Sequence, residues 1–226
     1  MVNPDGYLFT QTDNRLWRKT RKPNGDTGCF GTDANRNFGY HWGTGGSSDN
    51  ACSDTYMGEA AFSEVETSNM RDWLTAHNDT IKFYNNVHSY SQLVLLPWGF
   101  GYEEPDNVDD LYRVAQAGND ALYAVHQKTY EVIYLHQLSL RMLTFLVTTA
   151  TSTQVGCIPC LLYVASGGSL DWTLGELGIP YSYAMELRDT GEFGFLLPED
   201  QIIPTGEEVW AFHMTVAREI IKEFVP

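Results

Sequence analysis

Four residues stand where predicted strands or loops end, the places where α/β proteins carry their chemistry. His88 follows the strand-like stretch FYNNV, Glu186 lies within YSYAMELRDTG, and Arg36 and Arg18 belong to DANRNF and NRLWRKTR. A histidine at the end of a core strand is either a packing residue or a metal ligand that needs partners. Each of the others also has an ordinary structural interpretation. Glu186 could pair with Arg188, and the two arginines could be turn or surface residues.

The elements that must position these residues follow from hydrophobic periodicity. We expect helices at about 63–77, 106–127 and 205–224, and strands at about 81–88, 92–99 and 179–189. Capping boxes predict that two of the helices begin at Ser63 and Thr205. Asn3-Pro4-Asp5-Gly6 predicts a turn, and Val65 and Trp73 are expected on the buried side of the first helix. Strands that alternate with helices predict a layered α/β fold in one domain.

The composition excludes some classes of partner. The chain has 226 residues, 43% of them hydrophobic, and 14 basic against 29 acidic residues give a net charge of −15. Such an acidic chain is not expected to bind nucleic acid or an anionic membrane. We expect a monomer.

Four cysteines bear on the cellular compartment. Cys29 and Cys52 bracket a loop rich in Gly, Ser and Asn, and we predict a disulfide between them, which fits an oxidising, extracellular setting. Cys157 and Cys160 have CxxC spacing. Without a second CxxC, two ordinary half-buried thiols are favoured over a zinc ribbon.

Taken together, several stretches resemble the zinc carboxypeptidases of the pancreatic A/B type, peptidase family M14. They are NPDGY, NRLWRKTR, DANRNF, HSYSQLVLLPWG, YVASGGSLDW and ELRDTGEFGFLLPEDQIIPT. The resemblance implies an α/β fold with a mixed twisted sheet and helices on both faces, a carboxypeptidase-like α/β/α sandwich whose N-terminal strands and helices are missing. Residues 1–226 would then form a single partial catalytic domain.

The resemblance also implies a function, the release of C-terminal amino acids by a zinc-dependent exopeptidase. His88 would bind one Zn²⁺ ion, which polarises the scissile carbonyl and activates water. Glu186 would be the general base, and Arg18 would stabilise the oxyanion. Arg36 and Asn35 would hold the terminal carboxylate of a peptide or protein, since a guanidinium binds a carboxylate with two hydrogen bonds. The implied substrate-binding residues are Asn35, Arg36, Tyr163, Ser89, Tyr90 and Leu170.

Specificity is expected to depend on SGGSLDW. In the family, the position of Leu170 lies at the base of the side-chain pocket and is acidic in the forms that cleave basic residues. A leucine there cannot offset the desolvation of a cation. We therefore predict an A-type preference for aromatic or aliphatic C-terminal residues, with Ala184 in the pocket wall.

The two further zinc ligands of the family come from a His-x-x-Glu motif, which this sequence lacks. We expect that this motif and a signal peptide precede Met1 in a longer, secreted protein. The chain as written is then expected to bind zinc weakly and to lack carboxypeptidase activity. The alternatives are a non-catalytic remnant that binds C-terminal carboxylates, or an incomplete gene product.

Residues 133–155 form an anomalous insertion. They contain no Asp, Glu, Gly or Pro, and Arg141 is their one charged residue. Their removal restores the family spacing between Tyr130 and Tyr163, as expected of a retained intron, and a lid beside Tyr163 is the functional alternative. We expect the insertion to be poorly packed.

Overall fold

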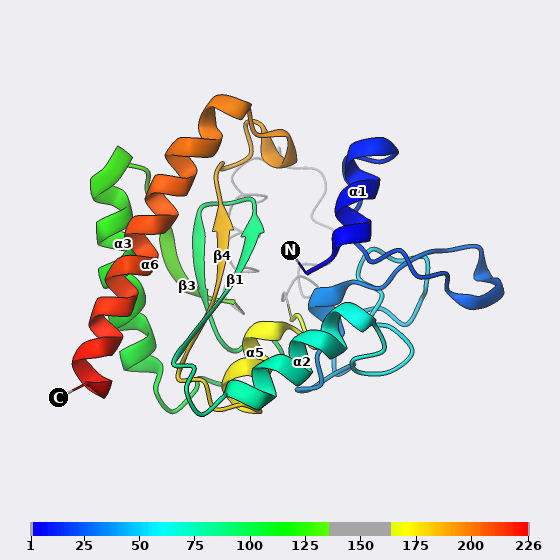
Figure 1. Ribbon diagram of the computed structural model, residues 1–226, viewed down its shortest axis with the longest axis horizontal. Helices are drawn as coiled ribbons and strands as arrows, with labels where there is room; N and C mark the ends of the chain where they lie inside the picture. The colour runs from blue at the N-terminus through cyan, green and yellow to red at the C-terminus, as the bar shows by residue number, and fades with distance from the viewer. Residues whose placement is uncertain (1, 136–163, 226) are drawn as a thin grey trace, which may run out of the picture.

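The computed structural model describes residues 2–135 and 164–225, and a mixed sheet lies at its centre (Figure 1). The sheet has the strand order β1-β4-β2-β3, and within the described residues β1 therefore lies at one edge. β4 runs parallel to β1 and antiparallel to β2, and β2 runs parallel to β3. The strands are β1 Phe83–Ser89, β2 Leu93–Leu96, β3 Glu131–Tyr134 and β4 Tyr181–Leu187.

Helices lie on both faces of the sheet. α3 and α6, green and red in Figure 1, pack side by side on one face, and α5 contacts β1 and β4 on the other. The helices are α1 Pro4–Thr12, α2 Val65–His77, α3 Val108–His126, α5 Ser169–Gly175 and α6 Ile202–Phe224. Short 3₁₀ helices are η1 Gly25–Thr27, η2 Ala34–Arg36, η5 Gly194–Leu196 and η6 Glu199–Gln201.

Alternation along the strands divides the core between the two faces, because successive side chains point to opposite sides. Val94, Leu96 and Met185 pack in the cluster that α3 and α6 cover. Leu95 and Ala184 pack instead with residues of the opposite face. The predicted α/β fold with helices on both faces is therefore confirmed.

The predicted ends of three elements need correction. Residues 3–6 do not form a simple turn: Asn3 caps α1, its Oδ1 accepting the Gly6 N–H at 2.9 Å, with Pro4 in the first helical position. Neither capping box operates as predicted. α2 begins after Glu64 without a side-chain cap, and α6 begins at Ile202, so that Thr205 lies inside it and its Oγ1 donates to Gln201 O.

Two residues expected in the core are exposed. Val65 and Trp73 of α2 are 65% and 59% accessible. They line a groove of about 910 Å³ beside the edge strand β1, together with Ile81 and Phe83. The helical periodicity is real, but within the described residues the groove stays open over this face of α2.

The start of the anomalous insertion belongs to the sheet. Ile133 and Tyr134 are the last residues of β3, where Ile133 pairs with Leu95 and is 6% exposed. The expectation of poor packing is therefore wrong for these two residues, because the strand extends past the point where the composition changes. Residues 136–155 lie outside the described part of the chain.

Within the described ranges, 2–135 and 164–225, every helix is too short or too polar to cross a lipid bilayer.

Candidate active site

A cavity of about 80 Å³ lies where β1 and β4 end, between η2 and the start of α5. It brings together most of the residues singled out in the sequence, although they are separated by up to 168 positions along the chain. The lining residues are Arg18, Asn35, Arg36, His88, Ser89, Leu95, Leu135, Ala165, Gly168, Leu170, Asp171, Ala184 and Glu186.

His88 and Glu186 lie next to each other on neighbouring strands. They are direct partners in the parallel register of β1 and β4. Partners in adjacent strands project to the same face of a sheet, so both side chains enter the cavity. Within the described residues Glu186 Oε2 is buried without a hydrogen-bond partner, which leaves this oxygen able to accept a proton.

Burial shifts the pKa values of His88 and Glu186. Burial, the largest cause, and the charge of Arg18 together lower the pKa of His88 to about 4. The imidazole is therefore neutral at pH 7, the form that can bind a metal. Burial raises the pKa of Glu186 to about 7, while Arg18 opposes this shift. A carboxylate with a pKa near 7 can both accept and return a proton close to neutral pH.

Two guanidinium groups supply positive charge. Arg18 donates from Nε to Asp33 Oδ2 at 2.9 Å and forms an ion pair with the same carboxylate. Arg36 is 3% exposed and is held by the Asn35 and Gly46 carbonyls, at 2.8 and 3.1 Å. Both groups are thus fixed in orientation at the cavity wall before any ligand arrives.

The far wall of the cavity is apolar. Leu170 is 3% exposed and clusters with Leu95 and Ala184. Beside it, Asp171 Oδ2 accepts the backbone N–H groups of Gly99 and Phe100, at 3.0 and 2.9 Å. These bonds fix the wall segment, and Leu170 and Ala184 give this part of the cavity an aliphatic surface.

Asp171 should give the protein a distinctive pH dependence. Burial raises the pKa of Asp171 to about 7, although the two N–H groups and Arg36 favour its charged form. Because the folded-state pKa is raised, the stabilisation is complete below about pH 4 and is lost as the pH rises through 7. Relative to Asp171→Asn, the wild type should therefore lose stability between about pH 4 and 7. Urea unfolding at several pH values measures this difference, with Asp72→Asn, at an exposed carboxylate, as the control. A difference that does not change with pH would contradict the expectation.

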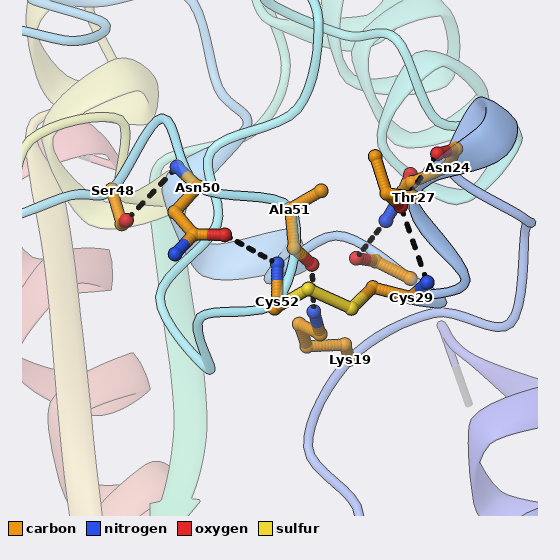
Figure 2. Close-up of a disulfide and its surroundings, with 9 residues drawn as sticks. Lys19, Asn24, Thr27, Cys29, Ser48, Asn50, Ala51 and Cys52 are labelled. Carbon is orange, nitrogen blue, oxygen red and sulfur yellow. Dashed lines mark hydrogen bonds between the residues drawn. A yellow bond between two sulfur atoms is a disulfide. The ribbon is translucent and has the colours of Figure 1, made fainter.

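A disulfide closes the loop that contributes Asn35 and Arg36 to the site (Figure 2). Cys29 and Cys52 are bonded as predicted, with their Cα atoms 5.2 Å apart and a separation of 23 positions in the sequence. Nearby, the Lys19 ammonium donates to Ala51 O at 2.7 Å. The loop is therefore anchored both covalently and through a buried lysine.

Removing the disulfide should destabilise the protein. For a loop of this length the chain-entropy model gives about 3 kcal/mol. We expect Cys29→Ser with Cys52→Ser to lower the free energy of unfolding by about that amount, as measured by urea denaturation. A loss below about 0.5 kcal/mol would show that the loop is constrained by its hydrogen bonds alone.

Two predicted site residues are not placed in the cavity. Tyr163 lies outside the described residues. Tyr90 does not line the cavity; its ring packs edge-on against Phe195 at 4.9 Å. Conversely, sequence reasoning missed Asp171 and Asn86, although Asp171 adjoins Leu170, and Asn86 is two positions from His88 and so on the same strand face.

The described residues do not make a complete zinc site. His88 offers one ring nitrogen, and among residues 2–135 and 164–225 no three His, Cys, Asp or Glu side chains lie close enough to hold a metal ion. A catalytic zinc site of this kind needs three protein ligands. The residues present therefore fit one ligand position and not the whole site.

Comparison with known sequences identifies a family. The model for "Zinc carboxypeptidase", Peptidase_M14, matches residues 1–212. Carboxypeptidase B of Astacus astacus is 48% identical over 210 residues, covering 92% of this chain and 62% of that protein. Carboxypeptidase A2 of Mus musculus is 41% identical over 220 residues, covering 97% and 47%. The chain thus spans about half to two thirds of the length of these relatives.

Solved structures share the fold. Bovine thrombin-activatable fibrinolysis inhibitor, in complex with tick carboxypeptidase inhibitor, has a TM-score of 0.85 at 35% identity, covering 99% of this chain and 68% of the other. Carboxypeptidase A from Helicoverpa armigera has a TM-score of 0.80 at 33% identity, covering 96% and 49%.

Proposed function

Because the chain belongs to the peptidase M14 family of zinc carboxypeptidases, we propose that its cavity receives the C-terminal residue of a peptide. The observation that carries this proposal is the convergence of Arg36, Asn35, Glu186 and Leu170 on one cavity. Arg36 and Asn35 bind the terminal carboxylate, and the residue's side chain lies against Leu170. In the complete enzyme Glu186 accepts a proton from the attacking water, and Arg18 stabilises the developing oxyanion.

The apolar wall supports an A-type preference. Leu170 and Ala184 offer no charge to a bound lysine or arginine, and the carboxylate next to Leu170, Asp171, already accepts two backbone N–H groups. Relatives named both carboxypeptidase A and carboxypeptidase B match the chain, so overall identity does not decide specificity. We therefore assign the preference for aromatic or aliphatic C-terminal residues to position 170.

A second candidate function is binding without hydrolysis. The described residues supply His88 alone as a zinc ligand, which favours a module that recognises C-terminal carboxylates but does not cleave. Both functions place the protein among extracellular peptides, a setting that the Cys29–Cys52 disulfide supports.

The test compares N-acetyl-phenylalanine with its C-terminal amide by calorimetric titration of the purified chain. Hydrogen bonds to charged groups contribute about 1.5–3 kcal/mol, so the amide should bind at least about tenfold more weakly. Equal affinity would refute carboxylate recognition.

Release of a C-terminal amino acid by the chain, with and without added Zn²⁺, then separates the two functions. We expect substoichiometric zinc after desalting and no turnover; stoichiometric zinc with turnover would establish the enzyme.

A further inference from the structure

The side-chain oxygen of Asn35 is surrounded by donors. Asn35 Oδ1 accepts the backbone N–H of Ser169 at 3.1 Å and the Nδ2 of Asn86 at 3.0 Å. The Ser169 hydroxyl lies 3.3 Å from the same oxygen. A backbone N–H can only donate, so it identifies which end of the Asn35 amide is the oxygen.

Asn86 reaches this oxygen from the sheet. It lies two positions before His88 on β1 and therefore on the same face. Its Nδ2 also approaches Ser169 Oγ at 2.7 Å, and Ser169 is 2% exposed at the start of α5. Tyr84 shares a side-chain hydrogen bond with this hydroxyl. Three elements, η2, β1 and α5, thus meet at one polar cluster.

The other end of the Asn35 amide faces the cavity. Its Nδ2 lies 3.4 Å from His88 Nε2, on the side where Arg36 contributes positive charge. We propose that Asn86, together with Ser169, is a positioning residue that fixes the orientation of the Asn35 amide, so that an N–H and not an oxygen meets the ligand carboxylate. This inference rests on the proposed function of Asn35 and Arg36.

The energetic argument concerns the flipped amide. Rotating it by half a turn would set its NH₂ against two donors, Ser169 N–H and the Asn86 amide. The Ser169 N–H would lose its acceptor, and the Asn86 amide would lose one of its two hydrogen bonds. It would also point an oxygen at the ligand carboxylate. A buried donor without a partner is destabilising, so the donors hold the amide in one orientation. Without Asn86 the Ser169 donors alone maintain this preference, and a carboxylate at position 86, which repels the Asn35 oxygen, opposes it.

Asn86→Asp is the direct test, because it keeps the side-chain shape and replaces the donor with an acceptor. We expect the affinity for N-acetyl-phenylalanine to fall at least about tenfold. Asn85→Asp is the matched control. It adds the same charge to the neighbouring position, on the opposite face of β1, where Asn85 contacts His213 Nε2 at 2.7 Å. The affinity of this control should stay within about twofold. Asn86→Leu is a neutral variant of similar size, and its affinity for N-acetyl-phenylalanine should lie between those of Asn86→Asp and Asn85→Asp.

A spectroscopic readout separates this proposal from the proposed function. In the ligand-free chain, the Asn35 side-chain amide protons should show nuclear Overhauser contacts to the His88 ring, and these contacts should disappear in Asn86→Asp while the backbone amide spectrum is preserved. If the wild type does not bind the ligand but these contacts change, the proposed function fails and the positioning role stands. If Asn86→Asp retains the contacts, or loses no more affinity than Asn85→Asp, the positioning role is wrong. If Asn86→Asp does not fold, the same two measurements on Asn86→Leu decide.

Discussion

Replacing Leu170 with aspartate should reverse the ligand preference of the cavity, from C-terminal phenylalanine to C-terminal lysine. Leu170 is 3% exposed and forms the apolar wall with Leu95 and Ala184. A carboxylate at this position would be desolvated, and a ligand cation would compensate it. Hydrogen bonds to charged groups contribute about 1.5–3 kcal/mol, and the loss of apolar contact weakens the aromatic ligand at the same time. Together these changes should shift the affinity ratio at least about 100-fold.

The measurement is a pair of titrations, with N-acetyl-phenylalanine and N-acetyl-lysine, for the wild type and the variant. Leu170→Asn is the control, because it has the size and polarity of aspartate without its charge. It should weaken phenylalanine binding without improving lysine binding. If Leu170→Asp leaves the ratio unchanged, position 170 does not contact the ligand side chain. If the asparagine variant gains lysine affinity equally, polarity and not charge determines specificity.

Replacing Glu208 with alanine should destabilise the protein strongly. Glu208 is fully buried on α6 and forms a two-pronged ion pair with Arg188, just beyond the end of β4. Removing the carboxylate leaves the Arg188 guanidinium buried and uncompensated, a change that typically costs about 3–5 kcal/mol. Domains are stable by only about 5–15 kcal/mol, so the variant should unfold at a much lower urea concentration.

Glu207→Ala is the matched control for this change. Glu207 is the preceding residue of the same helix, its side chain is 56% exposed, and it contacts His126 at 3.2 Å. Exposed ion pairs contribute about 0–1 kcal/mol, so this variant should unfold close to the wild type. The double variant Arg188→Met with Glu208→Leu removes both charges and should recover most of the lost stability. Equal losses for Glu207→Ala and Glu208→Ala would show that burial of the pair contributes nothing.

The sequence predicts the layers of this fold better than the ends of its elements. Hydrophobic periodicity places the central strands and the long helices, because it records which face of each element is covered. It places Val65 and Trp73 in a core, although the groove beside β1 leaves them exposed. The capping box at Thr205 predicts the start of α6 at that residue. In the structure the helix begins three residues earlier, at Ile202, directly after η6. Exposure of a helix face and the exact start of a helix depend on segments that are distant in the sequence, and local patterns carry no information about those segments.

The site was identified from motifs and not from periodicity. His88 and Glu186 are adjacent because β1 and β4 pair in parallel register, and no local pattern encodes a pairing between residues 98 positions apart. The family resemblance supplied that link. It gave no reason to single out Asn86, whose importance arises only where β1, η2 and α5 meet.

The two guanidinium groups at the cavity have a further consequence, since they lie in a chain whose net charge is −15. On the proposed function, an anionic peptide terminus is repelled by this net charge at long range and is attracted when it comes within a Debye length of Arg18 and Arg36, about 8 Å at physiological ionic strength. Salt then acts on the two halves of the encounter in opposite directions. Salt screens the long-range repulsion and so raises the association rate. It also screens the attraction between the guanidinium groups and the bound carboxylate and so raises the dissociation rate. Ionic strength should therefore control the rate of ligand exchange at this site. Association and dissociation should both be faster at high salt and slower at low salt.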